Sequence, residues 1–444
     1  MYDVIILGAG PAGYTAALRS GQLGMKTLLI EPGKIGGKGL HAGVMPSKGM
    51  LENARFYRRV MSASHFGVEG INQQNLRFSL STAMQRTAQI AERMARGIEE
   101  RLRERGVDIT RGRASLVSAT SVSVENREIE AAHIILATGS QTRELPFDMP
   151  AERTATAWNA LSRPEVPENV VVLGAAPVAV EYAQLFSMLG AGVTIATAYP
   201  TLLPMLGYRL REAVSRRLSN AGVKIVTDAG SYTYGRDTLR MGSETAACDL
   251  VVNCTAERAV VPEGRLRLTM SGPFVQVDDY LRTSEETVYA VGNVNGVVPT
   301  ARSASAQGLY AVNHIAGLSE AWDPGAEPVI VYGQPELAQA GRTESELEAD
   351  GLDFRAVEAP LSDNAKALLA GVGDGFVRIL FERQYGEVLG VQIFADNASD
   401  LVGEASALLE FEGTVYDVAR TAHAHPAVSE VFMELGKTAT EELE

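Results

Sequence analysis

The chain has 444 residues, which is too many for one hydrophobic core, so about three domains are expected. Its net charge of −14 argues against a nucleic-acid partner and against binding to acidic membrane surfaces. No apolar run approaches the ~20 residues that a membrane-spanning helix needs, and the N-terminus shows no secretion signal. These features predict a cytoplasmic protein without a membrane span.

The first 31 residues have the layout of a dinucleotide-binding unit. An apolar strand over residues 3–7 leads into Gly8, Gly10 and Gly13, a helical stretch follows, and a second apolar strand ends in Glu31. Such glycines permit a tight turn and a close approach of the backbone to a pyrophosphate, while the acidic residue can accept hydrogen bonds from ribose hydroxyls. This order of strand, glycines, helix, strand and acid predicts a bound dinucleotide.

Two segments follow before the middle of the chain. Residues 36–48 read G-G-K-G-L-H-A-G-V-M-P-S-K and open a predicted helix. Farther on, an apolar strand over residues 133–136 ends in Ala137, Thr138 and Gly139. A run of this kind, bounded by a glycine, is typical of a buried strand in a parallel sheet.

A second strand–helix–strand unit spans residues 169–197. It begins its turn with Gly174, but the middle glycine of the motif is Ala176, whose Cβ points where the backbone must approach a pyrophosphate. Its second strand ends in Thr197, where NAD enzymes usually place an acid, and no Arg or Lys lies within residues 198–205 to hold a 2′-phosphate. We therefore expect nicotinamide binding to be weakened or lost, although NAD(P)H remains a possible cofactor.

The last third of the chain carries two more landmarks. Residues 288–293 read V-Y-A-V-G-N, and a run of small residues begins at Ala301. Near the C-terminus, residues 423–430 read H-A-H-P-A-V-S-E. With the earlier segments, these landmarks resemble the flavin-dependent pyridine-nucleotide-disulfide oxidoreductases (dihydrolipoamide dehydrogenase, glutathione reductase and mercuric reductase) over nearly the whole chain.

The resemblance implies an α/β fold with two doubly wound, Rossmann-like dinucleotide-binding domains and a C-terminal α+β dimerisation domain. The expected limits are residues 1–145 and 273–322 for the FAD-binding domain, 146–272 for the NAD(P)-binding-like domain, and 323–444 for the dimerisation domain. It also implies FAD as cofactor. The residues expected at the FAD are Gly8, Gly10, Ala12, Gly13, Glu31, Gly37, Lys38, Lys48, Ala137, Thr138, Gly139, Gly292, Asn293 and Ala301.

In the family, a Lys–Glu ion pair lies beside flavin N5, and Lys48 and Glu181 match it. A positive charge beside the ring stabilises anionic reduced flavin. His425 and Glu430 match the catalytic His and the carboxylate that orients it, which reach the flavin of the other subunit. The resemblance therefore implies a homodimer with shared active sites; the alternative is that His425 is retained only for packing.

Where the family carries its two redox-active cysteines, this chain has Gly39 and Val44. Loss of these side chains predicts that a small substrate can reach the flavin directly, past an apolar wall, with Lys38 available to attract an anionic group. The remaining cysteines, Cys248 and Cys254, are expected in one strand as buried thiols. No cluster around the six histidines suggests a metal site.

Two functional hypotheses follow. The first is an FAD-dependent oxidoreductase that exchanges electrons directly with a small substrate or acceptor, with NAD(P)H as a possible second partner. The second is a non-catalytic flavoprotein that serves as a scaffold or binding subunit. The altered second dinucleotide motif favours the scaffold, whereas the retained Lys48, Glu181, His425 and Glu430 favour the enzyme.

Overall fold

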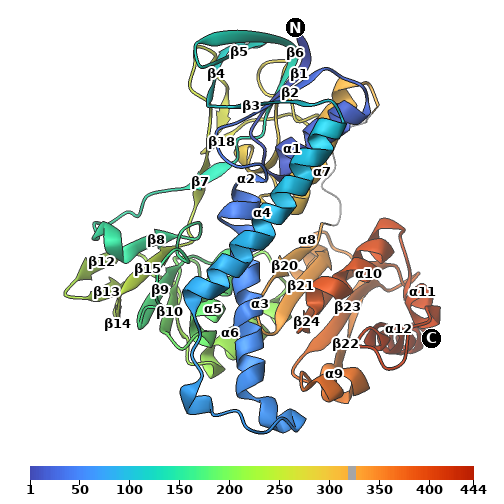
Figure 1. The fold of residues 1–444 in the computed structure, drawn as a ribbon. Coiled ribbons are helices and arrows are strands. Elements are labelled where there is room, and N and C mark those ends of the chain that lie inside the picture. Colours follow the sequence, from blue (N-terminus) through green and yellow to red (C-terminus); the bar gives the residue numbers. More distant parts are fainter. Residues whose placement is uncertain (319–326) are drawn as a thin grey trace.

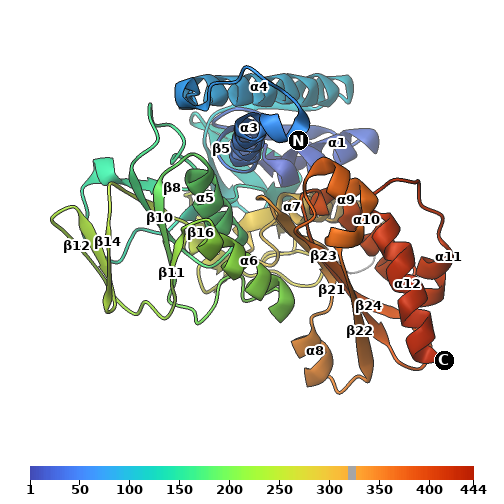
Figure 2. The same cartoon turned by 90° about the horizontal axis from the view of Figure 1, so that it is seen from below.

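The computed structural model describes residues 1–318 and 327–444. Figure 1 shows three regions of sheet, with the N-terminal sheet at the top, a second sheet at the lower left and a third at the lower right. The view from below separates the second and third sheets in the same way (Figure 2). The prediction of an α/β fold with two parallel sheets and a C-terminal α+β part is confirmed.

The first sheet contains five parallel strands in the order β3-β2-β1-β6-β19. Its strands β1, β2 and β19 and the C-terminal end of β6 are mostly buried, as expected for a parallel sheet covered on both faces. An antiparallel meander extends it beyond β6. The strands are β1 (Tyr2–Leu7), β2 (Thr27–Glu31), β3 (Asp108–Arg111), β4 (Ala114–Ser118), β5 (Ser121–Val124), β6 (Arg127–Leu136) and β19 (Val288–Ala290).

The second sheet is also parallel, in the order β11-β10-β9-β15-β8, and a small antiparallel sheet flanks it. Its strands are β8 (Thr154–Thr156), β9 (Asn169–Leu173), β10 (Gly192–Ala196), β11 (Lys224–Val226) and β15 (Leu250–Asn253). The flanking strands are β12 (Tyr232–Gly235), β13 (Thr238–Met241) and β14 (Glu244–Ala247). Cys248 lies two residues before β15 and Cys254 directly after it, rather than both within one strand, and both are buried.

The third sheet is antiparallel in the order β20-β21-β24-β23-β22. Its strands are β20 (Val329–Val331), β21 (Glu336–Gly341), β22 (Phe354–Pro360), β23 (Phe376–Glu382) and β24 (Val388–Ala395). Helices α10 (Ala398–Glu410), α11 (Val415–Arg420) and α12 (Glu430–Leu443) lie at the outer side of this sheet (Figure 2). The short helices α8 (Glu344–Ala349) and α9 (Ala365–Ala370) connect its strands.

The remaining helices pack on or between the first two sheets. Figure 1 shows the long α4 running from the first sheet towards the second, alongside α3. Helix α4 begins at Ser79, whose side chain accepts a hydrogen bond from the backbone N–H of Thr82. The bounds are α1 (Pro11–Gln22), α2 (Gly37–His41), α3 (Val44–Met61), α4 (Leu80–Glu104), α5 (Pro177–Met188), α6 (Tyr208–Asn220) and α7 (Ala301–Ile315).

Two connections link the first and second sheets. Strands β7 (Ser140–Thr142) and β16 (Glu257–Ala259) form a two-stranded antiparallel ribbon between them. The chain then returns to the first sheet, where Gly264 bridges to Leu116 of β4 before β17 (Met270–Ser271) and β18 (Phe274–Val275). The expected domain limits stay a prediction, and the limit at 322/323 lies outside the described residues.

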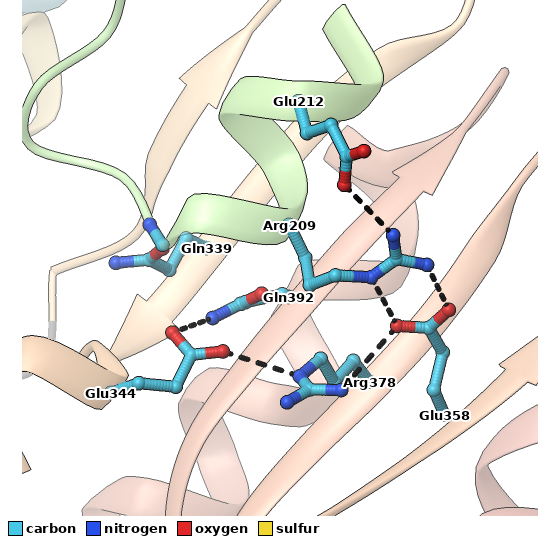
Figure 3. A network of polar contacts seen from close by, with 8 residues as sticks. Arg209, Glu212, Gln339, Glu344, Glu358, Arg378 and Gln392 are labelled. Atoms are coloured by element: carbon cyan, nitrogen blue, oxygen red, sulfur yellow. Dashed lines mark hydrogen bonds and ion pairs between the residues drawn. The ribbon is translucent and has the colours of Figure 1, made fainter.

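A partly buried polar network fixes α6 to the third sheet (Figure 3). Arg209 Nε donates to Glu358 Oε2 at 2.9 Å, and Arg378 lies between this carboxylate and Glu344, with its Nε 3.2 Å from Glu344 Oε1. Gln392 Nε2 donates to Glu344 Oε2 at 2.9 Å. These contacts join segments that are far apart in sequence, so the second and third sheets are held in one arrangement.

Candidate active site

A cavity of about 700 Å³ lies where the parallel strands of the first sheet end. Gly8 follows β1, Glu31 ends β2, Gly112 follows β3 and Ala137 follows β6, and all four line it. Ligands of doubly wound sheets bind outside these carboxyl ends. The volume falls in the range of small-molecule and cofactor sites.

The turn between β1 and α1 requires glycine for close backbone approach. Gly8 has φ +103°, and a Cβ there would lie 2.4 Å from the carbonyl oxygen of Ala137. A Cβ on Gly13 would lie 1.8 Å from the Gly8 oxygen. Gly37, also at positive φ, would bring a Cβ within 2.9 Å of Gly10 Cα. The glycines thus pack α1 and α2 against the strand ends.

Most residues predicted from sequence to contact FAD converge on this cavity. Those that line it are Gly8, Gly10, Ala12, Glu31, Gly37, Lys38, Ala137, Thr138, Gly139, Gly292, Asn293 and Ala301, together with the predicted substrate-pocket residues Gly39 and Val44. Gly13 and Lys48 do not line it: the first packs against Gly8, and the second points to Glu181.

Glu31 is held as an acceptor at the rim. Its Oε2 accepts from the Ala9 backbone N–H at 2.6 Å and its Oε1 from the Gly33 N–H at 2.7 Å. The side chain is mostly buried but borders the cavity. Each carboxylate oxygen has a second lone pair, so the group can still accept from a ribose hydroxyl.

The N-termini of two long helices face the cavity. Pro11 and Ala12 of α1 and Ala301 of α7 line it. Gly308 allows α7 to lie against α1, because a Cβ there would be 2.2 Å from the Ala12 oxygen. Unpaired N–H groups and the helix dipoles favour an anion at this place. A dinucleotide pyrophosphate therefore fits this end of the cavity.

Several lining residues were missed by the sequence reasoning. They include Arg113, Gln141, Trp158 and residues 260–263. Arg113 follows the end of β3, so the strand-end rule could have found it once the sheet order was known. Gln141 lies in β7, Trp158 lies in the connection between β8 and β9, and residues 260–263 follow β16; none of these stretches carries a local pattern.

The structure adds an aromatic neighbour to the expected substrate-pocket residues Gly39 and Val44. Both line the cavity, but the indole of Trp158 lies against the neighbouring Gly43: a Cβ there would be 2.0 Å from Trp158 Cζ3. Lys38 Nζ donates to the Ser140 oxygen at 2.6 Å, and burial lowers the pKa of its ammonium, partly offset by Glu257. This end is therefore lined by an aromatic ring and an ammonium group.

Lys48 and Glu181 meet across the boundary between the first two sheets. Lys48 Nζ lies 2.5 Å from Glu181 Oε2, and Glu181 Oε1 accepts from the Tyr332 backbone N–H at 3.1 Å. The Tyr332 ring centroid is 4.8 Å from Lys48 Nζ. Burial raises the pKa of Glu181, and Lys48 only partly offsets this. Lys48 lies one helical turn beyond Val44 on α3, and neither it nor Glu181 lines the cavity.

His425 and Glu430 form a second pair, in the connection between α11 and α12. His425 Nδ1 lies 2.9 Å from Glu430 Oε1, and the Ala427 N–H donates to Glu430 Oε2 at 2.9 Å. The Ala427 N–H and His425 lower the pKa of Glu430. The His425 side chain is 76% exposed and does not line the cavity of its own chain. Figure 1 places α11 and α12 far from the first sheet.

The second dinucleotide motif has the expected layout but stands apart from the cavity. Gly174 has φ +142°, with a Cβ position 2.5 Å from the Cys254 oxygen, and Ala176 is the N-cap of α5. Thr197 is buried, and its Oγ1 accepts from the Tyr199 N–H. None of the three motif residues lines the cavity.

The described residues contain no group of three or more His, Cys, Asp or Glu side chains placed to hold a metal ion. Within the same ranges, no helix is both long enough and apolar enough to cross a bilayer.

Comparison with known proteins gives the family. Residues 2–308 match the family described as "Pyridine nucleotide-disulphide oxidoreductase", and residues 327–435 match its dimerisation domain. Dihydrolipoyl dehydrogenase of Bacillus subtilis is 30% identical, with 98% of this chain and 97% of that protein covered. The Chlorobaculum parvum dihydrolipoyl dehydrogenase is 32% identical over 98% and 96%.

Solved structures agree. LpdA from Mycobacterium tuberculosis superposes with a TM-score of 0.89 at 25% identity, covering 99% of both chains. RclA from Escherichia coli, a flavoprotein disulfide reductase, has a TM-score of 0.87 at 20% identity, covering 98% of this chain and 99% of that one, and supports the fold alone. This chain belongs to the pyridine nucleotide-disulphide oxidoreductase family.

The family assignment confirms the predicted class of enzyme, the predicted cofactors and the presence of a dimerisation domain, but not a specific reaction. The chain is a flavin-dependent oxidoreductase by family, and FAD and NAD(P)H are the family's cofactors. Its C-terminal part is a dimerisation domain. The strand-end cavity fits FAD, since it combines helix N-termini for a pyrophosphate with the Glu31 acceptor and a volume of about 700 Å³.

Proposed function

We propose that this protein is an FAD-dependent oxidoreductase that works without a redox disulfide and passes electrons directly between FAD and a small substrate or acceptor. One observation carries the proposal: the two residues at the family's cysteine positions, Gly39 and Val44, line the cavity and have no sulfur. The existing thiols do not replace them. Cys248 and Cys254 do not line the cavity, and burial raises the pKa of Cys248 to about 12 and that of Cys254 farther. Neither supplies a thiolate at neutral pH.

The retained charges support an enzyme. When FAD is bound, it accepts and returns electron pairs. The ammonium of Lys48, held by Glu181 at 2.5 Å, lies one helical turn beyond the lining residue Val44, and its positive charge favours a more negative reduced cofactor. A chain kept only as a scaffold would not need this buried pair, because the charges cost desolvation energy.

A homodimer supplies the proton-transfer group. In this proposal the exposed His425 enters the cavity of the partner subunit and takes a proton from a substrate that is being oxidised. Glu430 accepts from His425 Nδ1–H, so Nε2 is the free acceptor that faces the substrate. Support comes from the exposed position of His425 and from its place between α11 and α12, inside the segment that matches the dimerisation domain. Figure 1 shows both helices far from the first sheet.

The second candidate function, a non-catalytic flavoprotein scaffold, is favoured by the second dinucleotide motif. Ala176 places a Cβ at the start of α5, and Thr197 offers a hydroxyl already engaged with the Tyr199 N–H instead of a carboxylate. The expected division into an FAD domain, an NAD(P)-like domain and a dimerisation domain is compatible with both the oxidoreductase and the scaffold.

The deciding experiment is anaerobic mixing of the FAD-loaded protein with NADH and then with NADPH, while the visible flavin absorbance is followed. Rapid bleaching would show that a nicotinamide donor reduces the flavin without a disulfide. If neither bleaches a flavin that dithionite still reduces, the donor is a different substrate. If no electron donor or acceptor supports turnover, the scaffold holds and the enzyme proposal is wrong.

A further inference from the structure

Trp158 brings an aromatic ring from the second sheet to the segment that has lost its cysteines. It lies between β8 and β9, yet its ring rests on the backbone next to Val44. A Cβ on Gly43 would lie 2.0 Å from Trp158 Cζ3 and 2.5 Å from Cε3. Real Cβ contacts are never this short, so the ring can occupy this place only because residue 43 is glycine.

The ring is held in one orientation. Trp158 Nε1 donates to Thr142 Oγ1 at 3.0 Å, and the Trp158 backbone N–H donates to Thr156 Oγ1 at 3.2 Å. Lys38 Nζ lies 5.2 Å from the ring centroid, within cation–π range. The polar edge of the indole is therefore satisfied by protein, and its half-buried apolar surface borders the cavity.

The Trp158 ring and the Lys38 ammonium together favour one chemical class of ligand. A flat aromatic side chain binds conjugated rings by offset stacking, a gain that an aliphatic ligand does not receive. The Lys38 ammonium beside it attracts an anionic oxygen. Burial lowers the pKa of this ammonium, so an anion beside it would also favour its charged form. Gly39 and Val44 add no polar group to this end of the cavity.

We propose that Trp158 contacts the substrate and makes the end of the cavity beside Lys38, Gly39 and Val44 selective for flat aromatic molecules that carry an anionic oxygen. This inference rests on the proposed direct exchange with a small substrate. It assigns to Trp158 a binding surface at the place where related enzymes carry a disulfide.

The test is calorimetric titration of the FAD-loaded protein with 2-naphthoate, which is redox-inactive, and with cyclohexanecarboxylate as the non-aromatic anion. The unaltered protein should bind 2-naphthoate more tightly. Trp158→Ala should weaken 2-naphthoate binding about 5- to 20-fold, in line with the loss of one stacking partner. Trp158→Phe should lose less than about 3-fold, because it keeps a ring.

Two glycine substitutions provide a second test variant and its matched control. Gly43→Ala keeps Trp158 but must displace its ring, so it should weaken 2-naphthoate binding as Trp158→Ala does. Gly97→Ala, on α4, meets no atom within 4 Å and should leave the affinity unchanged. FAD content and a melting curve show that each variant is folded.

Two results would overturn the inference. One is equal affinity of the unaltered protein for the two anions, including no binding of either. The other is 2-naphthoate binding that survives both Trp158→Ala and Gly43→Ala. Flavin bleaching by a nicotinamide does not involve either probe, so the proposed function can stand when this inference fails.

Discussion

Replacing Lys48 by methionine tests the buried ion pair directly. The change leaves the Glu181 carboxylate, which is 2% exposed, with the Tyr332 N–H as its remaining hydrogen-bond donor among the described contacts. Removing one partner of a buried pair costs about 3–5 kcal/mol. Lys48 itself is 24% exposed, so we expect the lower end, about 3 kcal/mol.

The corresponding shift in melting temperature can be estimated. Unfolding entropy is roughly 2.1 cal/mol/K per residue, or about 0.9 kcal/mol/K for a chain of this length, so about 3 kcal/mol lowers Tm by roughly 3 °C. Lys34→Met is the matched control, because Lys34 forms a 3.1 Å pair with Glu92 at the surface, with exposures of 65% and 49%. Its loss should cost less than about 1 kcal/mol and shift Tm by less than about 1 °C.

The pH dependence of the melting temperature of Lys48→Met follows from the ionisation of Glu181. Burial already raises the pKa of Glu181 above 4.5, and loss of Lys48 raises it farther. A carboxyl with a raised folded-state pKa destabilises the fold as pH rises above its ordinary value. The Tm difference between Lys48→Met and the unaltered protein should therefore shrink in acid. Adding Glu181→Gln should recover most of the loss. Equal shifts for Lys48→Met and Lys34→Met at neutral pH would refute the reasoning.

Three further predictions address the remaining parts of the molecule. His425→Ala should lower turnover with a proton-donating substrate about 10²- to 10⁴-fold, measured by steady-state kinetics, while the exposed His65→Ala should not; equal rates would remove the general-base role. Ala176→Gly should speed flavin bleaching by NADH several-fold, because it removes the Cβ at the α5 turn; no change in stopped-flow rate would mean that another feature limits nicotinamide binding. Burial opposes ionisation of Glu358, but hydrogen bonds and charge from Arg209 and Arg378 outweigh it and lower its pKa. Its stabilisation is present above the ordinary carboxyl range and is lost as pH falls through the folded-state pKa. Glu358→Gln should therefore lower Tm at neutral pH and converge with the unaltered protein in acid; a constant Tm difference across pH would contradict this.

The residues of the first dinucleotide turn could be predicted from sequence because their requirements are local. Gly8 needs a positive φ, Gly13 has no space for a Cβ beside the Gly8 oxygen, and Glu31 ends the next strand. All three of these residues belong to one strand–helix–strand unit within the first 31 residues. The meeting of Lys48 and Glu181, 133 positions apart, was predicted through family resemblance rather than from any pattern of spacing.

The surroundings of the lost cysteines depended on tertiary structure. From sequence, Gly39 and Val44 suggested direct access to the flavin past an apolar wall. The fold adds Trp158, whose ring lies against Gly43 and has its centroid 5.2 Å from Lys38 Nζ. Nothing adjacent to Trp158 in sequence indicates this contact, since it depends on how the second sheet is placed against α2 and α3. The sequence by itself determined that the first turn suits a dinucleotide and that Gly39 and Val44 stand at the two cysteine positions of the family. Only the tertiary structure decided that Trp158 lines the cavity beside these two positions and beside Lys38. Side-chain contacts between distant segments depend on three-dimensional distance and not on position along the chain.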